Sequence, residues 1–450
     1  MPLLIRNAKY LFVNPSMIKQ DVDVLIEGKR IVAVGRELTI PAKVDLIDAS
    51  GCAVLPGLIN THTHLYQNFL KGIAGGIPLV PWCNEILFPT VGVLRDAVKE
   101  NRRIPYLWTA LSAIEMIKGG TTCCIDMDVT YEETLQAWRE IGFRGVLAYT
   151  LTNRWVPAEL RASEIEMRQK VLDFISEYHR PDGLTQVFMA PSTLFLCDDD
   201  LMSWVGEQSE KLHLGVQIHI SETAGEVEDS IRETGLRPVE RLEKLGLLND
   251  RLSAVHCCHI NAKEIDLLAR TGANTVHCPK SNMKLADGIA PVTELKACGV
   301  PVAVATDGAA SNDLLDMWEE MRAAVLLARV SRNDAAALTP ADALQMATVD
   351  AARAARIDAG EIIPGKLADL ILLDLNKAHL QPFHTEDVAN MLVFCARSED
   401  VRDTIIHGKV VMRNRRITTI DEEEILREAV EVERELFSQR KNYQFVSSEK

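Results

Sequence analysis

Two histidines, His62 and His64, lie one residue apart at the end of the apolar run AVLPGLINTH. Successive side chains of a strand point to opposite faces, so residues two apart share a face and both imidazoles would point the same way. Nitrogen and oxygen ligands of this kind bind Zn²⁺ and also admit Fe²⁺ or Mn²⁺. A His-x-His pair alone is a weak indication of a metal site, so further ligands are needed from elsewhere in the sequence.

Groups of the same kind end three later apolar runs. His219 lies in VQIHISET, His256 in SAVHCCH and Asp307 in VAVATDGAASND. Glu222 follows His219 by three residues. If the runs are parallel strands of one barrel, their carboxyl ends meet at the same rim. Three histidines and a carboxylate, with water in the remaining position, would then form a catalytic site for a divalent metal ion, which lowers the pKa of bound water to roughly 7.

The other histidines are weaker candidates for metal binding or catalysis. The segment HCCH (256–259) resembles a zinc clip, but strand alternation puts His256 and Cys257 on opposite faces, so we assign only His256 to the site and His259 to a loop. His277 also ends an apolar run and would either contact a substrate or be a hydrogen-bonded structural residue. No cysteine has a clear base partner in sequence, which argues against a cysteine nucleophile. We assign five histidines to surface or structural positions: His179, His213, His379, His384 and His407.

Eight short apolar runs, separated by amphipathic helical stretches, occupy residues 56–360 and the few residues before them. Continuous apolar strands alternating with helices predict a parallel sheet that is buried on both faces. Eight is the number that closes a (β/α)₈ TIM barrel. An open doubly wound sheet is the alternative, although no glycine-rich phosphate turn follows the first run. The runs are AVLPGLINTH, TTCCIDM, RGVLAY, TQVFMAP, GVQIHI, LSAVHC, NTVHCP and PVAVATD.

Both ends of the chain have a different sequence pattern, in which short runs of alternating apolar and polar residues flank Gly- or Asn-containing turns. Lone hairpins are marginally stable, so the two ends are expected to combine. We therefore predict a small β-sandwich built from residues 1–55 and 361–450, beside a catalytic barrel of residues 56–360.

Composition and charge exclude several classes of protein. The chain is 47% hydrophobic and 25% charged, which is typical of a globular protein. Its net charge of -15 argues against nucleic acid or an anionic membrane as a partner. Several of the ten cysteines lie inside apolar runs, as reduced cysteines do, and the N-terminus lacks the long apolar core of a signal peptide. We expect a cytoplasmic protein that does not span a membrane.

The longer motifs resemble the amidohydrolase superfamily. They are PGLINTHTH, HISET, AVHCCH, HCPKSNMKLADGIAP, TDGAASND and GKLADLILLD. Within the superfamily they are most similar to the aminohydrolases that include methylthioadenosine/S-adenosylhomocysteine deaminase, 8-oxoguanine deaminase and the triazine hydrolases. The resemblance covers nearly the whole chain. It implies a (β/α)₈ barrel, a β-sandwich made from both termini, one divalent metal ion (Zn²⁺ first, Fe²⁺ or Mn²⁺ as alternatives) and a possible homo-oligomer.

The resemblance also implies a role for each residue. Asp307 would take a proton from the attacking water, and His256 would orient the hydroxide. Glu222 would protonate the ring nitrogen of the substrate and then help ammonia leave. The end of the fourth run, APSTLF, has no lysine that could bridge two metals, which implies a mononuclear site. The implied metal ligands are His62, His64, His219 and Asp307.

The expected function is hydrolytic deamination of a purine-like or other amino-substituted N-heterocycle, with release of ammonia after attack by a hydroxide formed at the metal. Cleavage of a triazine or cyclic amide C–N bond is the alternative, and a non-catalytic scaffold is a remote one.

The substrate is less well defined. Similar nucleoside deaminases carry an acidic residue before a tryptophan, where this chain has Pro81 before Trp82, and a histidine where it has Ser192. Ribose recognition is therefore not expected, unless Asn84 or Glu85 substitutes. Trp82 and His277 are the candidate substrate contacts, and either Trp82 or Trp155 would supply a stacking face.

Overall fold

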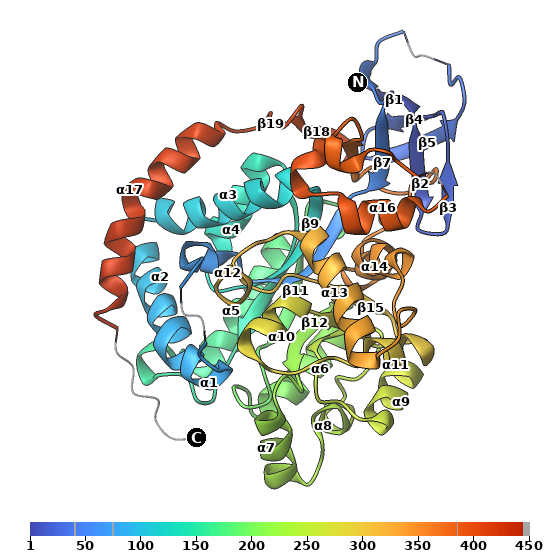
Figure 1. Cartoon of the computed structure of the whole chain (residues 1–450). Coiled ribbons are helices and arrows are strands. Elements are labelled where there is room, and N and C mark those ends of the chain that lie inside the picture. Colours follow the sequence, from blue (N-terminus) through green and yellow to red (C-terminus); the bar gives the residue numbers. More distant parts are fainter. Residues whose placement is uncertain (40–41, 74–75, 385, 444–450) are drawn as a thin grey trace.

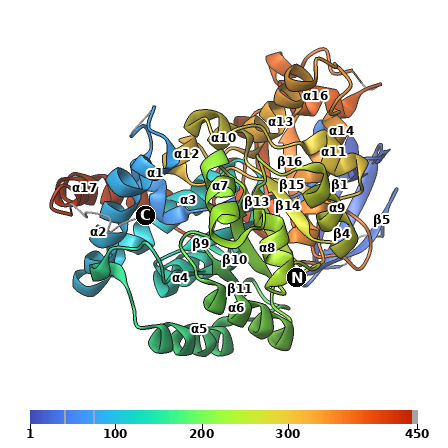
Figure 2. The same cartoon turned by 90° about the horizontal axis from the view of Figure 1, so that it is seen from below.

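A computed structural model describes residues 1–39, 42–73, 76–384 and 386–443. Its largest sheet contains eight parallel strands that follow one another in chain order from β8 to β15 (Figure 2). The sheet curls until its two edge strands meet, since the Asp307 amide donates to the His62 carbonyl oxygen at 3.0 Å. The predicted TIM barrel is therefore confirmed. The strands are β8 (Leu58–Thr63), β9 (Thr121–Asp128), β10 (Arg144–Leu151), β11 (Thr185–Pro191), β12 (Val216–Ile220), β13 (Leu252–His256), β14 (Asn274–His277) and β15 (Val302–Val304).

Helices surround the barrel and connect its strands (Figures 1 and 2). Left-handed glycines end several of them, as Gly142 does after α4 and Gly272 after α9, because glycine accepts a positive φ without strain. The longer helices are α2 (Phe88–Glu100), α3 (Arg103–Lys118), α4 (Tyr131–Ile141), α5 (Glu164–Tyr178), α6 (Asp199–Leu212), α7 (Ala224–Thr234), α9 (Ala262–Thr271) and α13 (Met317–Arg332). The shorter ones are α1 (Leu79–Trp82), α8 (Pro238–Lys244), α10 (Pro279–Leu285), α11 (Val292–Ala297), α12 (Ala309–Asn312), α14 (Pro340–Ala347), α15 (Val349–Ala354) and α16 (Val388–Cys395).

Two further sheets, one from the N-terminal part of the chain and one from both chain ends, confirm the predicted sandwich. Leu3, Ile5 and Val24 of one sheet share a buried apolar cluster with Leu370 and Ile405 of the other. The four-stranded sheet contains β1 (Leu3–Ala8), β4 (Val22–Glu27), β5 (Arg30–Gly35) and β6 (Asp45–Asp48). The seven-stranded sheet contains β2 (Tyr10–Asn14), β3 (Met17–Lys19), β7 (Cys52–Pro56), β16 (Leu370–Asp374), β17 (Val401–Ile406), β18 (Lys409–Arg413) and β19 (Arg416–Ile417).

The first predicted strand divides in two at Gly57. Residues up to Pro56 form β7, which pairs with β2 and β16 in the sandwich, and Leu58 begins β8 of the barrel. A Cβ atom at Gly57 would lie 2.1 Å from the side chain of Thr122, so this crossing between the two parts requires glycine. The prediction of a single strand over AVLPGLINTH was wrong in this respect, because one apolar run serves two sheets in succession.

A buried ion pair joins the barrel to the sandwich. Nε of Arg144, at the start of β10, lies 2.6 Å from Oδ2 of Asp369, just before β16. A terminal nitrogen of Arg144 also lies 3.0 Å from Nδ1 of His407. The side chains of Arg144 and Asp369 are each only 2% exposed, so each charge is stabilised by the other and not by water.

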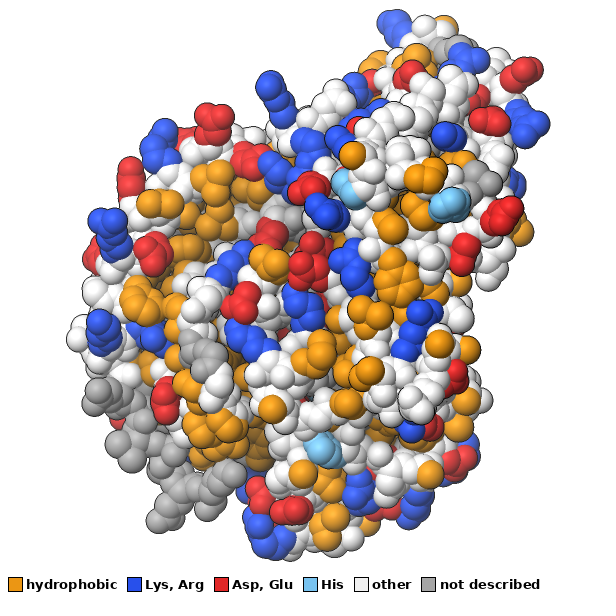
Figure 3. Space-filling view, viewed as in Figure 1, with side chains coloured by type: hydrophobic (Ala, Val, Ile, Leu, Met, Phe, Trp, Pro, Cys, Tyr) orange, Lys and Arg blue, Asp and Glu red, His pale blue; other side chains and the backbone are white. Residues whose placement is uncertain are grey.

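The last helix, α17 (Glu422–Arg440), packs against α2 and α3 on the side of the barrel away from the sandwich (Figure 1). Ile425, Ala429 and Leu436 form its buried side. Among the described residues, no helix combines the length and apolar character needed to cross a membrane. Acidic and basic side chains are interspersed over the face shown in Figure 3.

Candidate active site

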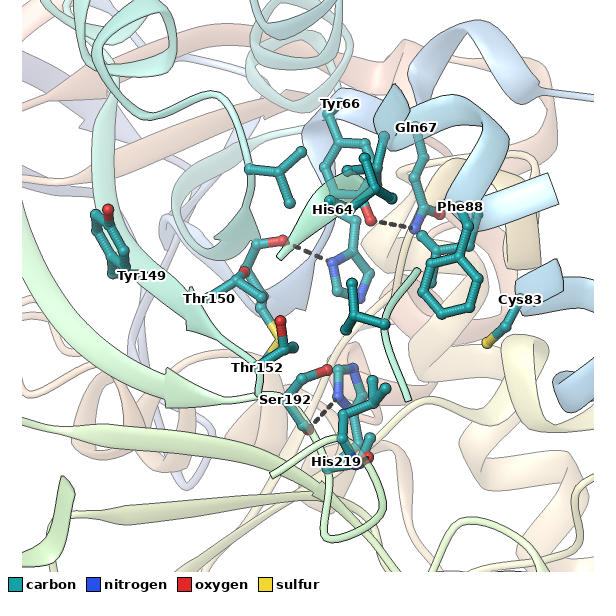
Figure 4. Close-up of a pocket in the computed structure, with 18 of the residues that line it drawn as sticks. His64, Tyr66, Gln67, Cys83, Phe88, Tyr149, Thr150, Thr152, Ser192 and His219 are labelled. Atoms are coloured by element: carbon teal, nitrogen blue, oxygen red, sulfur yellow. Dashed lines mark hydrogen bonds between the residues drawn. The ribbon is translucent and has the colours of Figure 1, made fainter. Parts of the chain in front are cut away.

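Three histidines and one aspartate meet at the carboxyl end of the barrel strands. His62 is the second-last residue of β8, His64 follows that strand, His219 lies in β12 and Asp307 follows β15. Nε2 of His62 and Nε2 of His64 each lie 3.4 Å from Oδ1 of Asp307. Nε2 of His219 lies 3.2 Å from Nε2 of His62. The four residues predicted as metal ligands are thus brought together, and His64 and His219 point toward one another across the cavity (Figure 4).

The other ring nitrogen of each histidine faces an oxygen atom. A carbonyl oxygen can only accept a hydrogen bond, so each of these Nδ1 atoms carries the proton and each Nε2 presents a lone pair. The Gln217 amide is oriented the same way because its Nε2 donates to the Thr61 carbonyl oxygen at 2.8 Å. The pairs are His62 with Gln217 Oε1 (2.9 Å), His64 with the Met127 carbonyl (2.7 Å) and His219 with the Ser192 carbonyl (2.8 Å).

This donor set fits a divalent metal ion. The three lone pairs converge on one another and on the Asp307 carboxylate, an arrangement that is repulsive between the imidazoles without a cation. Burial lowers the pKa of His64 to about 4 and holds the pKa of His219 well below its usual range, so both rings are neutral. Tetrahedral ligands at the usual Zn–N and Zn–O distances lie about 3.3 Å apart, close to the separations found here. The site is therefore suited to bind a divalent ion.

Asp307 is fixed by three donors. The amide of Gly308 lies 2.6 Å from Oδ1, and the hydroxyls of Ser281 and Ser311 lie 2.6 and 3.0 Å from Oδ2. Burial alone would raise the pKa of Asp307, but contact with His62 and attraction to His64 and His256 outweigh it and hold the pKa well below its usual range. The carboxylate is therefore ionised and held in one orientation.

His256 has the opposite hydrogen-bonding arrangement. It ends β13, and its Nδ1 accepts from the side-chain amide nitrogen of Asn282 at 3.0 Å. Burial lowers the pKa of His256 to about 3, so the ring is neutral and its proton lies on Nε2. That Nε2 is 3.5 Å from Oε1 of Glu222. His256 thus offers an N–H to the site, where the other three histidines offer lone pairs.

Glu222 lies in the turn between β12 and α7. The Ser221 and Glu222 amides donate to the two carboxylate oxygens of Glu226 at 3.0 and 2.9 Å, which fixes this turn. Burial, reinforced by the nearby Asp287, holds the pKa of Glu222 well above its usual range. A carboxyl group in this state is protonated at neutral pH and can act as an acid.

A cavity of about 530 Å³ opens onto these groups. Its wall includes Trp82, whereas His277 is not among the lining residues. His277 is 3% exposed and close enough to His256 to lower the pKa of that residue slightly. This placement favours Trp82 over His277 as a substrate contact. Apolar side chains dominate the rest of the wall, among them Leu87, Phe88, Phe195, Leu196 and Leu285.

Several residues that hold the site were missed in the sequence. Gln217 lies two residues before His219, so strand alternation could have placed both side chains inside the barrel. Thr223 and Glu226 have the spacing of a helix capping box, which marks the start of α7. Asn282 had no such local signal, because α10 meets β13 only in the folded structure.

His259, predicted to lie in a loop, is in the loop that follows β13. Its Nε2 donates to the Asp287 carbonyl oxygen at 2.5 Å, so it holds the loop after α10 rather than facing the cavity.

The barrel and its rim of histidines define a class of protein: the metal-dependent barrel hydrolases, in which imidazoles, a carboxylate and a proton donor act on a bond brought to the barrel mouth. The sequence model of the amidohydrolase family matches residues 53–411, and the chain belongs to this family.

Relatives and solved structures are similar over nearly their whole length. The chain is 35% identical to the 5-methylthioadenosine/S-adenosylhomocysteine deaminase of Pyrococcus furiosus, covering 94% of this chain and 98% of the relative. It is also 35% identical to the 5'-deoxyadenosine deaminase of Methanobrevibacter smithii, covering 95% and 96%. The crystal structure of an adenosine deaminase from Xanthomonas campestris with bound zinc superimposes with a TM-score of 0.90 at 32% identity, covering 98% and 99%.

Proposed function

We propose that this protein is a hydrolytic deaminase that removes an exocyclic amino group from a purine-like heterocycle and releases ammonia. One observation carries the proposal. The acid Glu222 and the N–H donor His256 face the same cavity as the residues suited to bind a divalent ion. Hydrolysis of an aromatic amidine requires a proton donor for the ring nitrogen as well as an activated water. The deaminase names of the relatives support the same reaction.

The ion is proposed to be one Zn²⁺, with Fe²⁺ or Mn²⁺ as alternatives. His62, His64, His219 and Asp307 would hold it. The ligand atoms of His62, His64 and Asp307 lie together, Nε2 of His219 lies 3.2 Å from Nε2 of His62, and the Nδ1 atom of each of these three histidines faces an oxygen atom, which leaves Nε2 for the ion. When bound, a divalent ion supplies a Lewis acid and lowers the pKa of water to roughly 7. The zinc in the Xanthomonas campestris deaminase supports this choice of metal.

The protein's own residues would move the protons. Asp307 accepts one proton from the attacking water, whose oxygen bonds to the ring carbon that bears the amino group. Glu222 donates a proton to the adjacent ring nitrogen, while the Nε2–H of His256 stabilises the added oxygen. The proton on Asp307 then passes to the amino nitrogen, the C–N bond breaks and ammonia leaves. The proton of the added hydroxyl group passes to Glu222. This step leaves a carbonyl group on the ring and restores Glu222 as an acid and Asp307 as a carboxylate.

Trp82 is the proposed platform for the heterocycle, because it lines the same cavity as Glu222 and His256 and an indole has a flat apolar face. Neither Asn84 nor Glu85 is among the residues that line the cavity, and Glu85 is exposed. The two residues considered as substitutes for a ribose-binding acid are therefore not in position to act as one. Ser192 does line the cavity, as Figure 4 shows beside His219.

The test is a screen for ammonia release by the zinc-loaded protein. The panel contains adenosine, 5-methylthioadenosine, S-adenosylhomocysteine, 5'-deoxyadenosine, adenine, guanine, 8-oxoguanine and aminotriazines. We expect release from at least one purine compound, with the oxo-purine as the other product. Release of ammonia from none of them by a protein that carries its metal would contradict the proposal. Turnover of triazines or cyclic amides alone would favour the alternative reaction.

A cytoplasmic location and a homo-oligomeric state stay predictions from the sequence. Light scattering coupled to size exclusion measures the second of these directly, since a monomer has a mass of 50.0 kDa.

A further inference from the structure

The side-chain amide of Asn282 lies behind His256, on the far side of the imidazole from Glu222. Asn282 is in α10 and is 1% exposed. Its Nδ2 lies 3.0 Å from Nδ1 of His256, while its Oδ1 has no hydrogen-bond partner among the described residues. An amide turned the other way would accept a proton from Nδ1 and so select the other tautomer of the ring. The orientation of this one amide therefore decides which nitrogen of His256 faces the cavity as N–H.

The neighbouring Asp287 favours the observed orientation of the amide. Its own backbone N–H donates to the Asn282 carbonyl oxygen at 3.0 Å, which brings its carboxyl group beside the Asn282 side chain. Burial raises the pKa of Asp287 to about 7, and the nearby Asn282 amide and Glu222 carboxyl group oppose that rise. A carboxyl oxygen beside an amide attracts the NH₂ group and repels the carbonyl oxygen, so Nδ2 stays on the side that reaches His256.

His256, Asn282, Asp287 and Glu222 are four buried neighbours. A hydrogen bond joins Asn282 to His256, Nε2 of His256 lies 3.5 Å from Oε1 of Glu222, and the Asp287 carboxyl group interacts electrostatically with Asn282 and Glu222. Asp287 is held in turn by His259, through the contact to its carbonyl oxygen. His256 and Glu222, which are proposed to stabilise the added oxygen and to donate a proton, thus both lie against the segment 282–287.

We propose that Asn282 is a positioning residue that fixes His256 as an Nε2–H donor toward the reacting oxygen. The consequence for catalysis rests on the proposed function, but the tautomer itself does not. With the opposite tautomer, the Nε2 lone pair would face the cavity, where it would repel a developing oxyanion instead of stabilising it. It would also resemble the lone pairs of the three other histidines and add a competing ligand to the cation site.

The first measurement is the tautomer of His256 in metal-free protein, from ¹⁵N–¹H correlation spectra of labelled imidazoles at pH 8.5, assigned with His256→Gln. We expect the parent ring to carry its proton on Nε2 alone. In Asn282→Asp an acceptor replaces the donor, so Nδ1 should become protonated. In Asn282→Ala both tautomers should be present. A parent ring protonated on Nδ1 would overturn the proposal.

The matched control is Asn274→Asp. Asn274, the first residue of β14, is an equally buried asparagine (2% exposed) that does not line the cavity. Its side-chain amide donates to the carbonyl oxygens of Asp250 and Leu252. Its replacement removes a buried donor of the same kind, so the variant reports the cost to stability. We expect Asn274→Asp to lose stability but to keep the Nε2–H tautomer of His256 and the parent kcat.

The second measurement is the kinetics of the zinc-loaded variants. Loss of one oriented donor to an oxyanion lowers kcat by roughly 100-fold or more, so Asn282→Asp and Asn282→Ala should lose that much with KM changed by less than about threefold. A variant whose tautomer changes while kcat stays within twofold would overturn the proposal. So would a kcat loss with the parent tautomer retained. If the parent deaminates no heterocycle, the proposed function fails, while the tautomer result is unaffected.

Discussion

The Nε2 atoms of His62 and His219 lie 3.2 Å apart, each with its lone pair directed toward the other. The Nδ1 atom of each ring faces an oxygen atom, Oε1 of Gln217 for His62 and the Ser192 carbonyl for His219, so these contacts place the Nδ1 proton of each ring away from the other ring. Two facing lone pairs at this distance are stable only with a cation or a shared proton between them. Burial and the neighbouring histidines hold the pKa of His219 well below its usual range, which favours a metal cation in this position.

Replacement of His219 should therefore remove the metal. We expect purified parent protein to carry about one divalent ion per chain and His219→Ala to carry little or none, as measured by elemental analysis. Added Zn²⁺ should raise the thermal midpoint of the metal-free parent, because a ligand that binds only the native state stabilises it. The variant should show a much smaller shift.

The control for this experiment is His384→Ala, which removes an exposed histidine outside the cavity. It should bind the metal as the parent does. Stoichiometric metal at parent affinity in His219→Ala would mean that the cation is held elsewhere.

Gln217 should tune the affinity of the site without touching the ion. Its Oε1 accepts from Nδ1 of His62 and fixes the tautomer of that ligand. Loss of such a partner commonly costs 10–100-fold in metal affinity, so Gln217→Leu should bind Zn²⁺ weaker by about that factor in a competition assay with a chelator. Gln186→Leu is the matched control. Gln186 lies near the first residue of β11, where its amide donates to the Arg356 carbonyl oxygen, and the variant should bind Zn²⁺ as tightly as the parent does. Equal affinities for both variants would show that His62 needs no such partner.

The order of the strands and the ligands at their ends could be predicted from the sequence, because both depend on local patterns. Apolar runs marked the eight strands, and a polar residue at the end of a run such as His219 must lie at the barrel rim. Alternation along one strand likewise assigned His62 and His64 to a common face.

What could not be predicted depends on contacts between distant parts of the chain. Asn282 reaches His256 only once α10 has packed beside β13, and Arg144 meets Asp369 across 225 positions of sequence. The end of β7 was missed for a different reason. Its residues are as apolar as those of β8, so hydrophobicity does not separate a strand of the sandwich from one of the barrel.

Glu222→Gln should retain the metal and the fold but lose most of the activity. The substitution keeps the shape of the side chain and removes its acidic proton, so we expect kcat to fall by roughly 10²–10⁴-fold. Because the pKa of Glu222 is raised, the parent should stay active through neutral pH and lose activity as the pH rises through that pKa. Glu207→Gln, at an exposed site on α6, should leave kcat unchanged. A kcat near that of the parent in Glu222→Gln would remove its role as the acid.

Glu320 should make the stability of the protein depend on pH. It is buried beside Asn312, and burial raises its pKa to about 8, whereas an unfolded glutamate has a pKa near 4.5. The native state thus keeps a proton that the unfolded state loses, so this contribution to the free energy of unfolding is full at low pH and is lost as the pH rises toward 8. In Glu320→Gln, urea midpoints measured from pH 5 to 8 should fall less steeply than in the parent. Parallel profiles would mean that Glu320 is ionised throughout.

Arg144→Met should destabilise the junction between the barrel and the sandwich more than the ion pair itself stabilises it. The substitution leaves the Asp369 carboxylate buried without its cation, and breaking a buried pair in this way costs about 3–5 kcal/mol. The double variant Arg144→Met/Asp369→Leu removes both charges and should recover a large part of that loss. Urea unfolding of the two single variants and the double variant gives the coupling free energy. If the double variant were as unstable as the sum of the single variants, the two residues would act independently, and the junction would depend on the apolar contacts around them.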